Sequence, residues 1–190
     1  NTLSGSLTYN DFGYTGNGHS SQALKSDKVA GEPPILSASH SNNIYNSKNV
    51  DAGFNYKRTF AKEDQELEIN VNTSAETNKS TSANEQLLLP QDSLFYGRKS
   101  SNPGKVNQTE IRIDYAQPVM KDVNFGIGGK SSFYNINSTS LVDGYFPGLA
   151  LYQPDASLSN NLEYHHKVYA LYSEISFPVA NLFQSKIGER

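Results

Sequence analysis

The clearest residues that could do chemistry in this chain are the alternating triplet Glu110-x-Arg112-x-Asp114. Successive residues of a β-strand point to opposite faces, so this spacing puts all three charges on one face of a strand. Such a trio can contact a polar ligand, or it can form a ladder of ion pairs with neighbouring strands. The ladder is the favoured interpretation, and Glu110, Arg112 and Asp114 are also the candidate ligand contacts of that face.

The other reactive residue types predict no catalytic or metal site. His165 and His166 are adjacent, so on a strand they would face opposite sides and could not hold one metal ion without a bulge. The chain has no Cys, which excludes thiolate metal sites and Cys nucleophiles. The glycine-rich residues 13–18 lack the Lys-Ser/Thr that phosphate binding needs, and we expect a flexible external loop there. We therefore expect no cofactor, no metal and no enzyme.

A second group of candidate contacts lies in residues 144–152, the most apolar part of the polar stretches between strands. Aromatic side chains exposed in a loop can bind a ligand or a partner. They can also pack the loop over the rest of the fold, and the two interpretations stand equal. The candidate residues are Tyr145, Phe146 and Tyr152.

The elements that must position these residues alternate in polarity with period two, which is typical of half-exposed β-strands. Leu67, Ile69 and Val71, for example, alternate with Glu66 and Glu68. About seven segments show this pattern, each near the roughly ten residues that a tilted strand needs to cross a bilayer. They centre on residues 3–9, 50–56, 67–73, 111–115, 123–133, 169–177 and 183–187.

Short and long connections alternate strictly between these segments. Loops longer than about 15 residues are uncommon in compact soluble domains. Outer-membrane β-barrels, in contrast, have short periplasmic turns and long extracellular loops. The short turns are predicted at residues 61–64, 117–122 and 178–181, and the long polar loops at 13–46, 76–105 and 135–161.

The side chains of the strands indicate a membrane. The charges lie on one parity, which would face a hydrated lumen, while the apolar parity would face lipid. Aromatic residues lie near both ends of the apolar faces, where barrels carry their interfacial girdles. We expect Tyr56, Phe60, Tyr115, Phe125, Phe177 and Phe183 at the periplasmic edge, and Tyr9 and Phe133 at the outer edge.

Composition supports this interpretation and excludes others. Only 18% of residues are charged and 36% are hydrophobic, yet there are 12 Tyr and 9 Phe, which suits neither a typical soluble enzyme nor a disordered chain. The net charge of −3 and the lack of a basic stripe argue against a nucleic-acid partner. A soluble β-sandwich or solenoid is the alternative fold, and it fits three long polar stretches poorly.

Four segments resemble the barrel domain of TonB-dependent outer-membrane receptors, in particular the Bacteroidetes-type outer-membrane β-barrel family. They are residues 50–60, 111–118, 163–174 and 186–190, the last with a Gly188-x-Arg190 motif. The resemblance implies a plugged barrel of about 22 strands in the bacterial outer membrane, surrounded by its lipids. It also implies import of a bulky nutrient, such as a glycan or a metal chelate, with the TonB complex and a surface lipoprotein as partners.

We expect residues 1–190 to be part of one barrel domain, an antiparallel transmembrane segment of an incomplete barrel. The first residue is not Met and the last residues belong to a strand, so we interpret the chain as a fragment. The plug, the segment that would contact TonB and the other strands would lie outside it. Two alternatives stand beside import: a non-transporting outer-membrane barrel with adhesive or structural loops, and a soluble all-β binding module.

Overall fold

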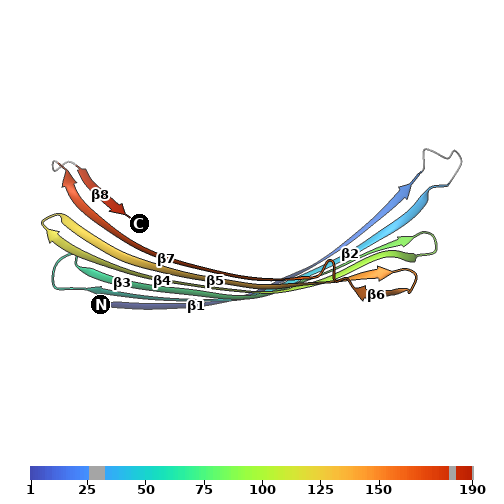
Figure 1. Cartoon of the computed structure of the whole chain (residues 1–190), viewed down its shortest axis with the longest axis horizontal. Coiled ribbons are helices and arrows are strands. Elements are labelled where there is room, and N and C mark those ends of the chain that lie inside the picture. The colour runs from blue at the N-terminus through green and yellow to red at the C-terminus, as the bar shows by residue number, and fades with distance from the viewer. Residues whose placement is uncertain (26–32, 180–182, 190) are drawn as a thin grey trace.

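The chain forms one antiparallel sheet of eight strands, shown by a computed structural model that describes residues 1–25, 33–179 and 183–189 (Figure 1). Neighbours in the sheet follow the order β1-β2-β3-β4-β5-β7-β8, and β6 pairs with the end of β5. The strands are β1 (Thr2–Leu24), β2 (Ile35–Thr59), β3 (Glu66–Leu88), β4 (Ser93–Met120), β5 (Val123–Phe146), β6 (Leu151–Pro154), β7 (Asn160–Val179) and β8 (Phe183–Glu189).

The predicted all-β segment of an incomplete barrel is confirmed. Seven of the strands match the predicted ones, and the eighth is the four-residue β6. The sheet is bent along its strands, so that both of its ends turn towards the same side (Figure 1). It is not closed: β1 and β8 lie at its two edges, and no pairing joins them among the described residues. No helix in this part of the chain is long and apolar enough to cross a membrane.

The prediction of long irregular loops is wrong, because most of the polar stretches are paired strand. β1 and β2 pair without interruption from Thr2↔Lys57 to Leu24↔Ile35, so the glycine-rich residues 13–18 also lie within β1. β3 and β4 likewise continue almost to their connection at residues 89–92. Pairing satisfies the backbone hydrogen bonds of these Asn-, Ser- and Thr-rich segments while their side chains stay exposed. Of the predicted loop 13–46, residues 26–32 lie outside the described part.

The short turns are confirmed at one end of the sheet, with one change of boundary. β4 extends to Met120, so Gln117 and Pro118 are strand residues and the turn is shorter than predicted. Asp64 and Asp122 adopt positive φ angles in their turns, a conformation that Asp tolerates better than most residues. Of the third predicted turn, residues 180 and 181 lie outside the described part of the chain, as does Arg190 of the Gly-x-Arg motif.

The strand register separates the sheet into two chemically different faces. Directly paired residues of an antiparallel sheet point to the same side. We call the face that carries the predicted apolar parity the outer face, and the opposite one the inner face. One outer row runs through five strands: Phe54, Val71, Ile111, Ser131 and Tyr169. The predicted separation of apolar and charged parities is thus consistent from strand to strand.

The half of the outer face nearer the short turns is an apolar band that nothing covers, whereas the other half carries Lys48, Lys79, Lys105 and Lys167. Of the hydrophobic side chains in the described residues, only Val142 is buried, while Leu7 and Leu171 are 76% and 81% exposed. A water-soluble protein rarely exposes such a continuous apolar surface, whereas lipid covers it in a membrane barrel. The face also carries aromatic pairs towards both ends of the apolar band, with centroids 6.2 Å apart for Phe60 and Tyr115 and 5.9 Å apart for Phe133 and Tyr169.

Candidate functional site

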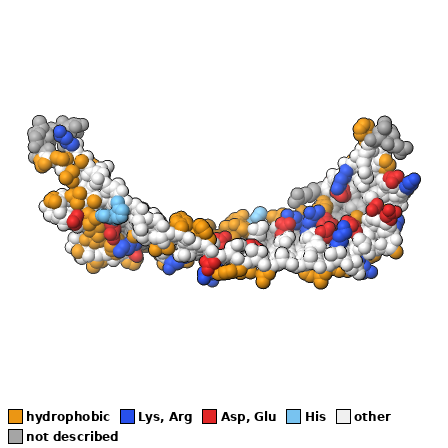
Figure 2. Space-filling view, turned by 180° about the vertical axis from the view of Figure 1, so that it is seen from behind, with side chains coloured by type: hydrophobic (Ala, Val, Ile, Leu, Met, Phe, Trp, Pro, Cys, Tyr) orange, Lys and Arg blue, Asp and Glu red, His pale blue; other side chains and the backbone are white. Residues whose placement is uncertain are grey.

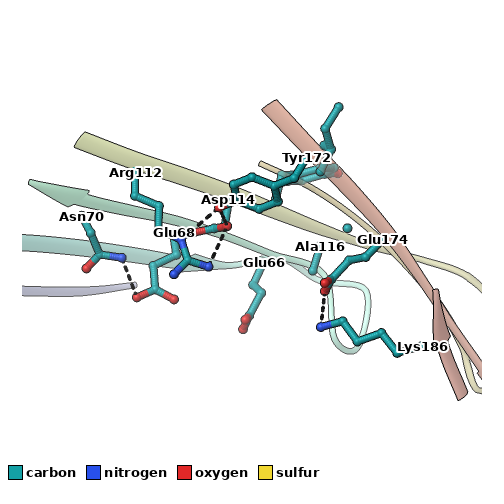
Figure 3. A pocket seen from close by; sticks show the side chains of 12 residues that line it. Glu66, Glu68, Asn70, Arg112, Asp114, Ala116, Tyr172, Glu174 and Lys186 are labelled. Carbon is teal, nitrogen blue, oxygen red and sulfur yellow. Dashed lines mark hydrogen bonds and ion pairs between the residues drawn. The ribbon is translucent and has the colours of Figure 1, made fainter. Parts of the chain in front are cut away.

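The candidate site is a polar hollow on the inner face, near the end of the sheet that carries the short turns. Figure 2 shows Lys, Arg, Asp and Glu side chains gathered over that arm of the molecule. The hollow has a volume of about 310 Å³ and draws its lining from β3, β4, β5, β7 and β8. Its main polar side chains, labelled in Figure 3, are Glu66, Glu68, Asn70, Arg112, Asp114, Tyr172, Glu174 and Lys186.

Arg112, Asp114 and Tyr172 form the centre of this hollow. Arg112 Nε lies 2.7 Å from Asp114 Oδ2 on the same strand, and it also donates to the Tyr172 hydroxyl at 2.9 Å. The Tyr172 hydroxyl in turn donates to Asp114 Oδ1 (Figure 3). Each group therefore holds the other two, and the guanidinium and the carboxylate are fixed on the inner face with their remaining edges exposed.

Tyr172 reaches this pair because the strand between them carries a glycine. Gly128 of β5 pairs with Asp114 on one side and with Tyr172 of β7 on the other. A Cβ at position 128 would overlap the tyrosine ring. The ring thus crosses β5 over Gly128 to bond to side chains on β4.

Ion pairs surround this centre on the same face. Lys130 Nζ lies 2.7 Å from Glu110 Oε2 across the β4–β5 pairing. Two more pairs, Lys57–Glu66 and Lys186–Glu174, have N–O distances of 2.6 Å each. Their side chains keep about a third to three fifths of their surface exposed, from 32% at Lys130 to 61% at Lys186. The inner face at this end of the sheet therefore carries a network of exposed ion pairs.

A further carboxylate, Glu68, is held by amides. It accepts hydrogen bonds from Asn55 at 2.8 Å and from Asn70 at 3.0 Å. Because an amide carries no charge, Glu68 contributes a negative charge to the hollow that these two partners do not neutralise.

The structure brings the three predicted residues together on one face, with Glu110, Arg112 and Asp114 at alternate positions of β4. Glu110 pairs with Lys130 of the neighbouring strand, as the favoured ladder requires, whereas Arg112 and Asp114 pair with each other on β4. The role of the three residues as ligand contacts stays a prediction. Sequence reasoning missed Tyr172, Lys130 and Lys186. The alternating glycines at 126 and 128 were a usable signal, because glycine in a strand marks a position where a neighbouring group approaches closely.

The second predicted group lies at the other end of the sheet, on the outer face. Tyr152 of β6 donates to Glu85 Oε1 at 2.7 Å, and Lys99 Nζ lies 4.0 Å from the centre of its ring. The Tyr145 ring packs beside it at 5.3 Å. Burial raises the pKa of the Tyr152 phenol, and the bond to Glu85 raises it further. Tyr145 and Tyr152 thus pack β6 against the sheet, whereas Phe146 is exposed; a binding role for the three stays a prediction.

The histidines form no larger group. His165 lies on the outer face with Glu163 and Asn135, while His166 points to the inner face beside Tyr164, as expected for adjacent strand residues. His19 and His40 face each other across β1 and β2 with 2.7 Å between their Nδ1 atoms. Among the described residues, no group of three or more His, Cys, Asp or Glu side chains could hold a metal ion.

A match to a family model agrees with this architecture. The model of the outer membrane protein beta-barrel family matches residues 58–190, more than half of the chain. No curated protein matches the chain. Among solved structures, the ferric yersiniabactin uptake receptor from Yersinia pestis is similar at 7% identity, with a TM-score of 0.31 over 96% of this chain.

The similar region covers 34% of that receptor, so the chain spans about a third of its length. The family match, together with the uncovered apolar face, gives the location as the bacterial outer membrane. The chain belongs to the outer membrane protein beta-barrel family.

Proposed function

We propose that this chain forms part of the wall of a wide outer-membrane barrel that imports a bulky nutrient, in the manner of Bacteroidetes-type TonB-dependent receptors. The observation that carries the proposal is an open sheet with a charged inner face. Eight strands that close on themselves leave an interior just filled by side chains. Here eight strands leave β1 and β8 at separate edges. Further strands are then needed, because every backbone group in lipid requires a partner.

A wide barrel gives the inner face its role. A lumen larger than that of an eight-stranded barrel holds water and can pass a solute. The exposed ion pairs around Arg112 and Asp114 suit such a hydrated wall, and they line the solute's path in this proposal. The chain performs no chemical step in it and needs no cofactor.

The mode of transport rests on the resemblance of the sequence to TonB-dependent receptors. In that mode a plug closes the barrel. The TonB complex contacts an N-terminal segment of the receptor and supplies the energy that moves the plug. Residues 1–190 are then one part of the barrel domain, with the plug and the other strands in the rest of the protein. A surface lipoprotein that captures the nutrient is a further partner in this proposal.

The test compares uptake with and without energy. Cells that lack the protein and cells that lack the TonB complex should both lose uptake of the same labelled nutrient. Vesicles that contain only the purified protein should not pass it. Free passage through such vesicles would instead indicate a passive channel. Normal uptake in cells that lack the protein would favour a structural or adhesive barrel.

A further inference from the structure

Two aromatic clusters lie on the inner face, beyond the ion pairs and towards the end of the sheet opposite the short turns. The first consists of Phe12, Tyr14 and Tyr45, with ring centroids 5.6 to 6.4 Å apart. Tyr14 pairs directly with Tyr45 and shares its parity with Phe12, opposite to the lipid-facing Leu7 of the same strand. Phe12 and Tyr14 are 60% and 56% exposed, so their ring faces are open to the lumen.

The second cluster lies across the sheet on β5 and β7. It consists of Tyr134, Tyr164 and His166, where Tyr134 pairs directly with His166. The ring centroids of Tyr134 and Tyr164 are 6.3 Å apart, and those of Tyr164 and His166 are 6.1 Å apart. Three strand spacings, about 14 Å, separate β2 from β5. The register also places Tyr45 six residues along the strands from the row of Tyr134, so these two rings lie on the order of 25 Å apart.

The floor between the clusters is built from amides and hydroxyls. Ser74 Oγ donates to Asn49 at 3.0 Å, and Asn78 donates to Glu76 at 3.0 Å. Just past the row of Tyr45, the hydroxyls of Ser82 and Ser100 lie 2.8 Å apart. These groups keep donors and acceptors available on a half-exposed surface, because an amide or hydroxyl can make more hydrogen bonds than the one each uses here.

Among the described residues, no Lys or Arg side chain points into this part of the inner face. Within residues 8–18, 41–51, 74–84, 100–108, 132–142 and 160–168, all of which the structure describes, every Lys and Arg points to the outer face. These residues are Lys48, Lys79, Lys105 and Lys167. The charges that point inwards here are the carboxylates of Asp51 and Glu76. An anionic ligand would meet like charge without a compensating cation, which disfavours it.

We propose that this face binds an uncharged oligosaccharide, with the two aromatic clusters stacking on sugar rings and the floor between them bonding to sugar hydroxyls. Aromatic rings offer large apolar faces to the C–H surfaces of sugars, and a few well-placed polar groups fix orientation. The inference rests on the proposed import function, since it takes the inner face as the wall of the solute's path. It narrows the nutrient from a glycan or metal chelate to a neutral glycan.

The test measures binding to the protein purified from outer membranes in detergent. The probes are neutral oligosaccharides, namely maltohexaose, xylohexaose, mannohexaose and chitohexaose, and one anionic ferric catecholate chelate. We expect at least one sugar to bind and the chelate not to bind. Tyr45→Ala should weaken sugar binding by about tenfold, as expected when a stacked ring is lost. Ile44→Ala is the matched control, because Ile44 is the neighbouring outer-face residue and should leave affinity unchanged.

Three results would overturn the inference: binding of the chelate alone, binding of no sugar, or sugar binding that Tyr45→Ala and Phe12→Ala both leave unchanged. A drop in thermal stability without a change in affinity would show that the rings contact another part of the protein and would also overturn it. Uptake separates this inference from the proposed function. Sugar binding without energised uptake would contradict the proposed import function and leave the sugar site standing. Energised uptake of the chelate would contradict the sugar site and leave the import function standing.

Discussion

The ring of Tyr172 lies over Gly128 on the inner face and crosses one strand to reach the next. A Cβ at position 128 would overlap that ring and come within 2.7 Å of Asp114 Oδ1. On the outer face, at the other end of the sheet, a second tyrosine crosses a glycine: a Cβ at Gly97 would lie 2.9 Å from Cζ of Tyr152. In both places a tyrosine reaches a carboxylate two or more strands away because a glycine leaves the space. The contacts of both predicted groups of site residues thus depend on the space that Gly128 and Gly97 leave, as well as on charged side chains.

Gly128→Ala should therefore destabilise the barrel. The added methyl forces the Tyr172 ring away from Arg112 and Asp114, and overpacking of this kind costs about 1–3 kcal/mol. The free energy of unfolding from phospholipid vesicles in urea measures the loss. Gly16→Ala is the control, since a Cβ there would meet nothing within 4 Å. If removal of the ring in Gly128→Ala/Tyr172→Ala restores no part of the loss, the crossing is not its cause.

The pair Lys130–Glu110 should contribute little to stability. Both side chains are 32% exposed, so water screens their attraction although Nζ and Oε2 lie 2.7 Å apart. A double-mutant cycle with Lys130→Ala and Glu110→Ala should give a coupling energy of about 0.2–1 kcal/mol that falls as salt is added. A coupling several times larger and insensitive to salt would mean that the inner face is dry, which contradicts a hydrated lumen.

The attachment of β6 should weaken at alkaline pH. Burial and the bond to Glu85 raise the pKa of the Tyr152 phenol above its usual value of 10.0. When β6 is detached, the Tyr152 phenol loses its proton at a lower pH than when β6 is attached. The free energy that holds β6 on the sheet is therefore fully present below about pH 10 and falls as pH rises above it. The protection factors of the amides of residues 151–153, which correct for the faster intrinsic exchange in base, should therefore fall above that pH. In Tyr152→Phe the exchange should be faster at neutral pH and lose this alkaline step; an unchanged step would assign it to another group.

Arg substitutions should separate the two faces at adjacent residues of β5. Ser131 lies between Ile111 and Tyr169 on the outer face, whereas Ser132 lies between Glu110 and Val168 on the inner face. Ser131→Arg puts a cation in lipid and should cost about 2 kcal/mol of unfolding free energy. Ser132→Arg gains a carboxylate neighbour in water and should change it by less than about 0.5 kcal/mol. Equal costs in vesicles would show that lipid does not contact the outer face alone.

The parts of the fold that follow from alternation were predictable from the sequence. Leu67, Ile69 and Val71 identify a strand and its apolar side without any knowledge of its neighbours, and the register confirms both. The length of the strands was not predictable. Residues 76–88 and 93–105 are rich in Asn, Ser, Thr and Lys, which are typical of loops, and it is pairing with neighbouring strands that makes them strands. Local propensity carries no information on that pairing.

The candidate site was predictable only within one strand. Period two puts Glu110, Arg112 and Asp114 on one face, but the hydroxyl that joins Asp114 comes from 58 residues along the chain. The Tyr172 hydroxyl reaches Asp114 only because of the register between β5 and β7, and the alternation of polar and apolar residues does not predict that register. The aromatic cluster of Phe12 and Tyr14 was missed for another reason. Its parity is opposite to that of Leu7, and Tyr14 and Tyr45 fall in the predicted loop 13–46, where parity has no meaning.

The central claim is that one parity of this sheet faces lipid and the other faces water, and thiol labelling at Ser131 and Ser132 tests it most directly. The chain contains no Cys, so a single introduced thiol reports on its own position. In outer-membrane vesicles, Ser132→Cys should react rapidly with a charged maleimide that does not enter lipid, while Ser131→Cys should be protected until detergent or urea is added. Rapid labelling of Ser131→Cys with protection of Ser132→Cys, or equal labelling of both, would contradict the account.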